Sequence, residues 1–412
     1  MKVLMFGWEF PPFKSGGLGT ACRDLVKGLV RNGTEVTFVM PTAPAGAQSE
    51  GATIIGADNY LSKVKIKTVK STLGPYQTGR SYEEHIEYLK KYGTAPKDGV
   101  YGKDLYEEVN RYALCAFEIT SEEPHDVIHA HDWMTYQAGI NARKVSGKPL
   151  VVHIHATEFD RTGGNPNSFI SHIEWTGLTA ADMIIANSNL TKQNVIKHYM
   201  IPEDKIKVVH WGIEADNPAY SMGYRSALSE KDKIVLFLGR VTIQKGPDYF
   251  VETARRVLDY VPEAKFVVAG DGDMMPRMIN RVAELGMADR FLFTGFLKGN
   301  DVHKAFQMAD LYVMPSVSEP FGLVALESLR NHTPILISKQ SGVAEVVNHA
   351  LKVDFWDVDE MTNKIVSVLL HAPLREELRD NGHRESGKFN LDEPARKTMD
   401  AYTEAWSRKA AV

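Results

Sequence analysis

The sequence predicts an α/β protein with two doubly wound, parallel-sheet domains that face a cleft. Short apolar runs alternate with amphipathic segments of helical period, which is the order typical of parallel strands connected by helices. The chain has 412 residues, more than a single domain usually contains. The alternation also lapses once, in a polar connector at residues 212–232, and then restarts.

The first half of the chain contains five predicted strands, at residues 3–7, 35–40, 126–130, 150–155 and 183–186. A helix is predicted at residues 21–31, after a glycine-rich turn at 16–19 and before Asn32-Gly33. Residues 43–100 interrupt the alternation, and their stretch 64–70 places lysines on one face of an inserted hairpin or small sheet. A solvated edge strand explains those lysines better than a binding patch does.

The second half repeats the pattern, with strands at residues 234–239, 266–270, 291–294, 311–314 and 335–338 and a helix at 249–260. A further helix is predicted to begin at Pro320, because proline suits the first helical turn. We therefore expect a first domain at residues 1–212, with the insertion 43–100, and a second at 213–392. The last segment, 393–412, is predicted to form a helix that packs back on the first domain.

Composition excludes several classes of function. The formal net charge of −4 provides no global basic field that would recruit nucleic acid or membrane. Cys22 and Cys115 are the only cysteines, too few for a disulfide framework or a cysteine-rich zinc site, and they fit a reducing cytoplasm. No apolar run approaches the roughly 18 residues that span a bilayer. Residues 1–8 lack a cleavage region, and we interpret them as a core strand.

Two cations follow the predicted strand at 234–239, where ligands of a doubly wound sheet bind. Arg240 offers a fixed fork of donors and Lys245 a point charge, so together they could hold a diphosphate and stabilise its charge as it departs. The alternative is a loop with two solvated cations.

Two carboxylates, Glu319 and Glu327, follow the strand at 311–314 and could bind a sugar and a ribose, or could be the acidic start of a surface helix.

Glycines also follow the first strand, in the segment KSGGLG at residues 14–19. Glycine allows a ligand to approach the backbone closely, and helix N-termini favour anions. A simple tight turn is the alternative. The spacing differs from the GxGxxG dinucleotide fingerprint, which argues against a nicotinamide dehydrogenase.

Histidines alternate on two predicted strands. His129 and His131 share one strand face, as do His153 and His155, and such pairs can be metal ligands. We favour structural roles and substrate contacts instead, because each pair lies on one strand and no Glu or Cys pattern completes a known metal site.

Taken together, these motifs resemble the retaining glycosyltransferases of family 4 and the bacterial glycogen and starch synthases, which share the GT-B architecture of two Rossmann-like domains. Lys14, Gly16 and Gly17 lie in a segment similar to the family's KxGGL, where the lysine and glycines contact the donor. Residues 129–133, HAHDW, are similar to the family's HAHDW segment, which implies that His131 lies beside the anomeric centre.

The resemblance also implies roles for the charged pairs. Arg240 and Lys245 match the pair that binds the donor's diphosphate, and Glu319 and Glu327 match the glutamates that meet the donor sugar and the ribose. His155 is a looser match to a substrate-side histidine. The remaining expected donor contacts are backbone or small side-chain groups of Phe321, Gly322, Leu323, Ser341 and Gly342.

Some residues depart from the pattern. Residues 319–323 read EPFGL and 340–343 read QSGV, where glycogen synthases usually have EPCGL and TGGL, so the α-glucan acceptor stays open. Asp271-Gly272-Asp273 resembles the acidic motif of metal-dependent glycosyltransferases, but a turn passing close to a nucleotide base is the better interpretation.

We therefore expect a cytoplasmic, metal-independent, retaining hexosyltransferase with no cofactor. The expected donor is ADP-glucose or UDP-glucose, and the expected acceptor is an α-1,4-glucan, as in glycogen biosynthesis. The alternatives are a family 4 enzyme acting on a lipid-linked, capsular or small-sugar acceptor, and a catalytically silent binding protein. Retention of Arg240, Lys245, Glu319 and Glu327 together argues against the silent protein.

Overall fold

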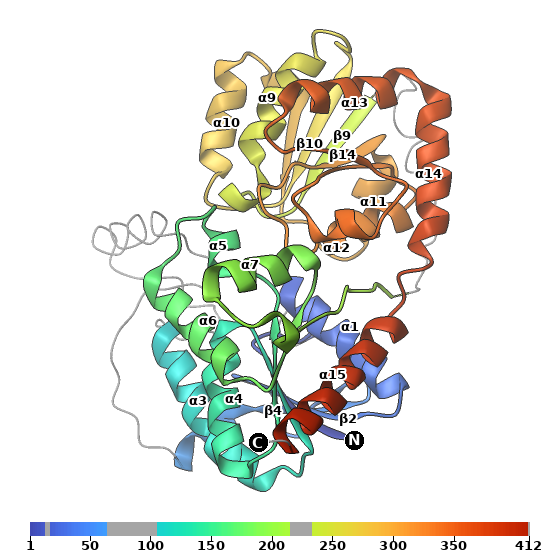
Figure 1. Ribbon diagram of the computed structural model, residues 1–412. Helices are drawn as coiled ribbons and strands as arrows, with labels where there is room; N and C mark the ends of the chain where they lie inside the picture. Colours follow the sequence, from blue (N-terminus) through green and yellow to red (C-terminus); the bar gives the residue numbers. More distant parts are fainter. Residues whose placement is uncertain (13–16, 64–104, 215–232, 411–412) are drawn as a thin grey trace, which may run out of the picture. The chain divides into compact units, whose positions relative to one another are not determined.

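The computed structural model describes residues 1–12, 17–63, 105–214 and 233–410 (Figure 1). Contacts divide the chain into two units, Met1–Gly212 with Leu391–Val412, and Ile213–Asn390. The sequence boundaries were drawn after residues 212 and 392. Lys14, Gly16, the alternating stretch 64–70 and most of the polar connector lie outside the described residues.

The first unit is built on an eight-stranded sheet with the order β3-β4-β2-β1-β5-β6-β7-β8. The strands are β1 Lys2–Phe6, β2 Glu35–Met40, β3 Gln48–Ser49, β4 Ala52–Gly56, β5 Val127–His131, β6 Leu150–Ile154, β7 Met183–Ala186 and β8 Ile206–Val208. Only the edge strand β3 runs antiparallel to its neighbour within this sheet. Strands β5, β6 and β7 are buried throughout, as expected of parallel strands covered on both faces.

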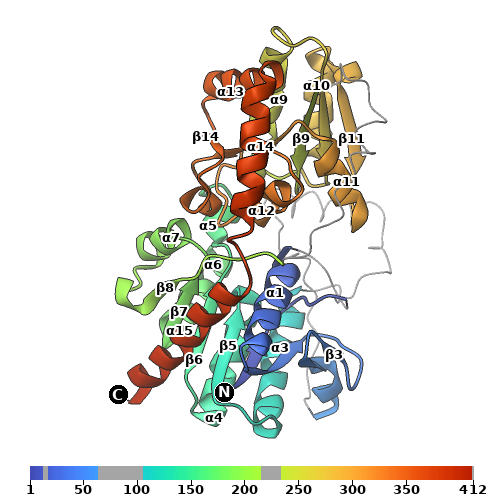
Figure 2. The ribbon, with the colours of Figure 1, turned by 90° about the vertical axis from the view of Figure 1, so that its right-hand side faces the viewer.

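Helices cover both faces of this sheet. They are α1 Gly17–Arg31, α3 Leu105–Glu122, α4 Trp133–Ser146, α5 Glu158–Arg161, α6 Ser168–Ala180, α7 Asn189–Tyr199 and α15 Asp392–Ala410, with 3₁₀ turns η1 Ala57–Lys63 and η2 Glu203–Lys205. On β5, His129 contacts Tyr402 of α15, whereas Ala130 faces Gly139 of α4. Successive strand residues point to opposite faces, so α15 and α4 lie on opposite sides. Helix α15 packs along α1 (Figure 2).

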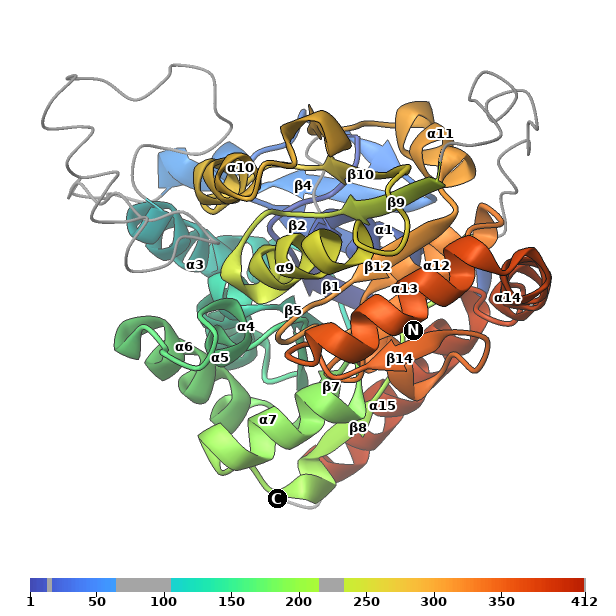
Figure 3. The same ribbon diagram turned by 90° about the horizontal axis from the view of Figure 1, so that it is seen from above.

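The second unit has a six-stranded, parallel sheet with the order β11-β10-β9-β12-β13-β14. Its strands are β9 Lys233–Leu238, β10 Ala264–Ala269, β11 Phe291–Gly295, β12 Leu311–Met314, β13 Ile335–Ser338 and β14 Leu351–Val353. Its helices are η3 Ile243–Lys245, α9 Pro247–Val257, α10 Met275–Glu284, η4 Ala288–Arg290, α11 Asn300–Met308, α12 Leu323–Arg330, η5 Gly342–Glu345, α13 Val358–Leu370 and α14 Ala372–Ser386. Helix α9 lies beside α13 (Figure 3).

The fold class is confirmed: both units are doubly wound α/β domains. In the second sheet the chain order reverses between β9 and β12, and in the first between β1 and β5. Such switch points are where ligands of this fold class bind, beyond the carboxyl ends of the strands. The predicted strands all occur, within one or two residues of their predicted ends. The short strands β3, β4, β8 and β14 had not been predicted.

Two predicted helix starts were wrong. Helix α1 begins at Gly17, not after the glycine-rich turn. Helix α12 begins at Leu323, not Pro320, because Glu319 pairs in extended conformation with Ser341. Gly322, with φ of 107°, then turns the chain into the helix. Glu327 consequently lies about one turn inside α12, whereas a helix start at Pro320 would place it about two turns inside.

The packing of α15 on α1 leads to a stability prediction. A Cβ added at Gly28 of α1 would lie 2.4 Å from the carbonyl oxygen of Leu391. This oxygen belongs to the backbone and cannot easily move away. We expect Gly28→Ala to lower the free energy of unfolding by about 1–3 kcal/mol, despite the better helix propensity of alanine. Urea denaturation measures the change. The control is Lys27→Ala, which removes a partly exposed ion pair with Glu50 (3.3 Å). A Gly28→Ala midpoint at or above that of the wild type would contradict the packing.

Candidate active site

The switch point of the second unit brings Lys245 and Glu319 together. Lys245 follows β9 and Glu319 follows β12, and the ammonium of Lys245 donates a hydrogen bond to Glu319 Oε2. Ser316 Oγ donates to the same oxygen at 3.2 Å. Both predicted residues therefore meet at the edge of the sheet where a ligand is expected.

The loops that carry this pair are packed tightly against each other. Gly246, with φ of 66°, ends η3 and precedes Pro247, the first residue of α9. A Cβ at Gly246 would lie 2.1 Å from the carbonyl oxygen of Pro315, so only glycine permits this approach. The amide of Val317 donates to the Gln244 carbonyl at 2.9 Å, which joins the loop after β12 to the loop after β9.

A third loop, after β13, also joins the site. The amide of Glu319 donates to Gln340 O, and the amide of Gly342 donates to Glu319 O, both at 2.9 Å. The amide of Val343 donates to Phe321 O at 2.7 Å. Glu319 is only 6% exposed. The loops after β12 and β13 thus bring five of the predicted donor contacts together. They are Glu319, Phe321, Gly322, Ser341 and Gly342.

The loop after β10 packs against the loop that holds Arg240. Gly239 and Gly270 end their strands so close together that a Cβ at Gly270 would lie 1.8 Å from Gly239 O. Val241 N donates to Asp271 O at 2.9 Å, and the Asp271 carboxylate accepts the amide of Gly272 at 2.8 Å. The acidic motif is therefore part of a turn beside β9. Arg240 itself is half-buried in this corner.

Tyr312 lies near two predicted site residues, Glu319 and Glu327, and the sequence analysis did not single it out. It lies in β12 with 2% exposure, and its hydroxyl donates to Leu238 O at 3.2 Å. Burial raises the pKa of Tyr312 well above its usual value, and the carboxylates of Glu319 and Glu327 raise it further. The phenol therefore stays protonated near both predicted glutamates. The sequence does contain a signal for it: a tyrosine in an otherwise apolar, buried strand indicates a hydroxyl that must find a hydrogen-bond partner there.

In the first unit, β5 and β6 bring the four histidines into one stack. His131 pairs in register with His153. The rings of His129 and His131 are 4.2 Å apart between centroids, as are those of His153 and His155. His131 Nδ1 lies 2.8 Å from His155 Nε2. Burial lowers the pKa of His131 to about 3 and that of the other three well below its usual value, so all four are neutral.

Ring nitrogens of this stack and the thiol of Cys22 lie as close together as metal ligands do. One group is His129, His131 and His153; the other is His131, His155 and Cys22 of α1, which the sequence analysis had not associated with the histidines. Within each group the donor atoms are within 4.8 Å of one another. In the first group the rings of His129 and His153 are 3° from parallel, and in the second the rings of His131 and His155 are 32° from parallel. The nearly parallel, stacked rings of His129 and His153 do not direct their lone pairs to one point, as a tetrahedral zinc site requires, which argues against the first group.

Asp132, the residue after His131, takes an unusual backbone conformation with φ of 58°. It does not cap its own helix α4. Its amide donates to His153 O at 2.9 Å, and its carboxylate accepts the amide of His155 at 2.8 Å. Burial raises the pKa of Asp132 to about 6, although Arg161 and two backbone amides act in the opposite direction. Asp132 therefore ties the end of β5 to the chain after β6.

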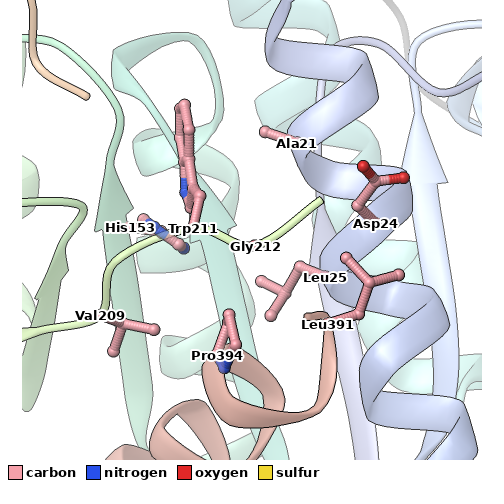
Figure 4. Close-up of a pocket in the computed structure, with 9 residues that line it drawn as sticks. All are labelled: Ala21, Asp24, Leu25, His153, Val209, Trp211, Gly212, Leu391 and Pro394. Carbon is pink, nitrogen blue, oxygen red and sulfur yellow. The ribbon is translucent and has the colours of Figure 1, made fainter. Parts of the chain in front are cut away.

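A small, mostly apolar pocket lies beside the histidine stack in the first unit (Figure 4). His153 lines it, and the ring of Trp211 in the same wall lies 5.1 Å from that of His155. The remaining lining residues are Ala21, Asp24, Leu25, Val209, Gly212, Leu391 and Pro394. Of the predicted contacts in the segment at residues 14–19, Lys14 and Gly16 lie outside the described residues, and Gly17 is exposed at the start of α1.

Comparison with known proteins identifies the family. Residues 2–215 match the starch synthase catalytic domain, and residues 224–385 match the glycosyl transferases group 1. An uncharacterized glycosyltransferase of Methanocaldococcus jannaschii is 31% identical over 418 residues, covering 98% of each chain. The chain belongs to the family 4 glycosyltransferases of GT-B architecture.

Two further proteins similar to this glycosyltransferase have more specific names. Glycogen synthase of Mycobacterium tuberculosis is 26% identical over 352 residues, 84% of this chain and 80% of that protein. Sucrose-phosphate synthase from Thermosynechococcus elongatus superimposes with a TM-score of 0.76 at 18% identity, over 98% of this chain and 99% of the other, which shows the shared fold. This chain is a glycosyltransferase. Within the described ranges, no helix has the length and apolarity needed to cross a bilayer.

The buried histidines lead to a prediction about acid stability. Their pKa values are lowered in the fold, so below about pH 6.5 the unfolded chain binds protons that the folded chain does not. Each histidine is expected to remove about 1.4 kcal/mol of unfolding free energy per pH unit below that point. Asp132, with its raised pKa of about 6, offsets one of them below that value.

Melting temperatures between pH 7.5 and 5 measure this dependence. His153→Leu removes one buried imidazole, whose two ring nitrogens have no hydrogen-bond partner among the described residues. We expect its melting temperature to fall less steeply with pH than that of the wild type. The exposed His172→Gln is the control and should follow the wild type. Parallel curves for all three proteins would show that the stack does not govern acid stability.

Proposed function

We propose that this glycosyltransferase moves glucose from ADP-glucose or UDP-glucose to the growing end of an α-1,4-glucan, with retention of anomeric configuration and without a metal ion. The observation that carries the proposal is the contact of Lys245 with Glu319 at the switch point between β9 and β12. A cation for the diphosphate and a carboxylate for the sugar lie side by side there, as transfer from a nucleotide-sugar requires.

The donor would bind to the second unit. Lys245 and Arg240 would neutralise the charge that develops on the departing diphosphate, in place of a divalent cation. Glu319 would bind the sugar hydroxyls, together with the backbone of residues 321–323, and Glu327 would bind the ribose. Ser341 and Gly342, which Glu319 contacts directly, would complete the pocket.

Retention is proposed from chemistry as well as from the family. The bond between the anomeric carbon and the phosphate oxygen breaks as the acceptor oxygen attacks the same face. The acceptor's proton passes to the departing phosphate oxygen, so no covalent nucleophile is needed. The carboxylate of Asp132, the residue after His131, accepts the amide of His155 at 2.8 Å.

His131 would position the reacting face as a neutral hydrogen-bond donor. If His155 Nε2–H donates to His131 Nδ1, then His131 carries its own proton on Nε2, which has no partner among the described residues. That N–H could donate to a sugar hydroxyl. Because His131 is fully buried, substrate contact requires a conformational change around it.

The acceptor would bind to the first unit. The match of residues 2–215 to the starch synthase catalytic domain and the relation to glycogen synthase favour an α-glucan. The segment EPFGL is nearer to the broad family 4 pattern than to that of glycogen synthases, so small-sugar, lipid-linked and capsular acceptors are the alternatives. The likeness to sucrose-phosphate synthase favours a small sugar among them. A cytoplasmic location is proposed from the two buried free thiols, Cys22 and Cys115.

Replacement of Lys245 tests the donor site. Lys245→Ala is expected to lower turnover by about 10²–10³-fold, the usual loss for one charge-stabilising donor. Arg240→Ala should act similarly. The matched control is Lys364→Ala on α13, which loses a surface ion pair with Glu360 (2.7 Å) and should keep wild-type turnover. Full turnover in folded Lys245→Ala would refute the assigned role.

Product analysis after chelation tests mechanism and acceptor together. Protein treated with EDTA is incubated with ADP-glucose or UDP-glucose and with glycogen, simple sugars or a lipid extract. We expect undiminished transfer to glycogen and a new α-linkage in the proton NMR spectrum. Loss of activity that Mn²⁺ restores would overturn the metal-free proposal, and a β-linkage would overturn retention. Transfer only to another acceptor would select the corresponding alternative.

A further inference from the structure

We propose that Arg161 is a positioning residue for the His131–His155 pair. This inference rests on the proposed function, because its kinetic test needs the transfer reaction. Among the described residues, Arg161 forms hydrogen bonds with Glu158, Glu174 and Ala156 and not with either imidazole. It acts through Asp132 and through the backbone that follows β6.

The backbone after β6 is held by side chains from several elements. The amide of His155 donates to Asp132, and the carbonyl of His155 accepts from Asn187 Nδ2, both at 2.8 Å. Arg161 Nη2 donates to the carbonyl of the next residue, Ala156, at 2.7 Å. The position of the His155 ring, and with it the 2.8 Å contact to His131, follows from these bonds.

Arg161 is the cation of this cluster and is surrounded by three carboxylates. Its guanidinium lies 2.7 Å from Glu174, 3.4 Å from Glu158 and 3.6 Å from Asp132. All four side chains are at most 8% exposed. Burial raises the pKa of each carboxyl group, and the charge of Arg161 opposes that rise. Arg161 thus keeps Asp132 ionised, and ionised Asp132 binds the amide of His155 more strongly.

Glu174 of helix α6 binds Arg161, and Tyr199 of helix α7 holds Glu174 in place. Glu174 of α6 accepts the amide of Glu158 at 2.9 Å and the hydroxyl of Tyr199 of α7. A planar fork that reaches a carbonyl and several carboxylates at once is a geometry that lysine cannot reproduce. The cluster therefore holds one geometry of the loop, and through it one geometry of the two imidazoles.

The kinetic test uses two variants with opposite expected signs. Arg161→Lys should lower kcat about 10–100-fold with little change in KM for the nucleotide-sugar, because a small misplacement costs rate and not binding. Its weaker contact should raise the pKa of Asp132 and move the acid limb of the kcat profile upward by about one pH unit. Glu174→Gln keeps an oxygen that can accept the hydrogen bond of Arg161 but removes the negative charge that offsets the charge of Arg161, so its acid limb should move to lower pH.

The control is Arg143→Lys. Arg143 also donates to a backbone carbonyl, that of Ala180, and pairs with an aspartate, Asp182, at 2.7 Å, but on the far end of α4. A merely structural role would lower stability in Arg161→Lys and Arg143→Lys alike and leave both pH profiles unchanged. That outcome would overturn the proposal.

A second readout does not depend on transfer activity. The full chain is labelled at histidine Cε1, and the signal of His155 among the 14 histidines is assigned with His155→Asn. We expect Arg161→Lys to shift the signal of His155, and Arg143→Lys to leave it in place. An unchanged signal in folded Arg161→Lys would also overturn the proposal. If the wild type transfers no sugar, the proposed function fails while this measurement still decides the role of Arg161.

Discussion

The ion pair between Lys245 and Glu319 is the interaction on which the second unit's site depends. Glu319 is only 6% exposed, and a carboxylate so buried is costly without a partner. The lysine supplies that partner and the serine hydroxyl of Ser316 a second one. Because the two charges come from loops after different strands, the pair also holds those loops in register. The contacts of Gly246 with Pro315 and of Gln244 with Val317 show how closely they pack.

The first unit also has a switch point, but the side chains that gather there are uncharged. Its switch point carries four neutral imidazoles, which burial keeps unprotonated. The charges lie one residue further along the chain, where Asp132 faces Arg161 and through it Glu174. Polar but uncharged groups at the stack can therefore be oriented by a charged cluster behind them, in a low-dielectric setting where such interactions are strong.

Local pattern predicted the regular elements well and the irregular ones poorly. Strands β2, β7, β12 and β13 begin and end at the predicted residues, because each is an apolar run bounded by polar groups or turn residues. Strands β3 and β14 are too short to show a period. The start of α12 was misplaced because Pro320 is a sound local signal for a helix. Pairing of Glu319 with Ser341, twenty-two positions away by number, overrode it.

By itself, the sequence determined the two doubly wound units, the strand ends that carry chemistry, and the residue types found there: cations after β9, carboxylates after β12, histidines at the ends of β5 and β6. Period and charge are local properties, and a single chain displays them. Only the tertiary structure decided which of these groups meet. Lys245 reaches Glu319, Cys22 joins the histidines, and Asp132 turns from its own helix toward His155. Those contacts depend on strand order and on packing between distant segments, which no local pattern records.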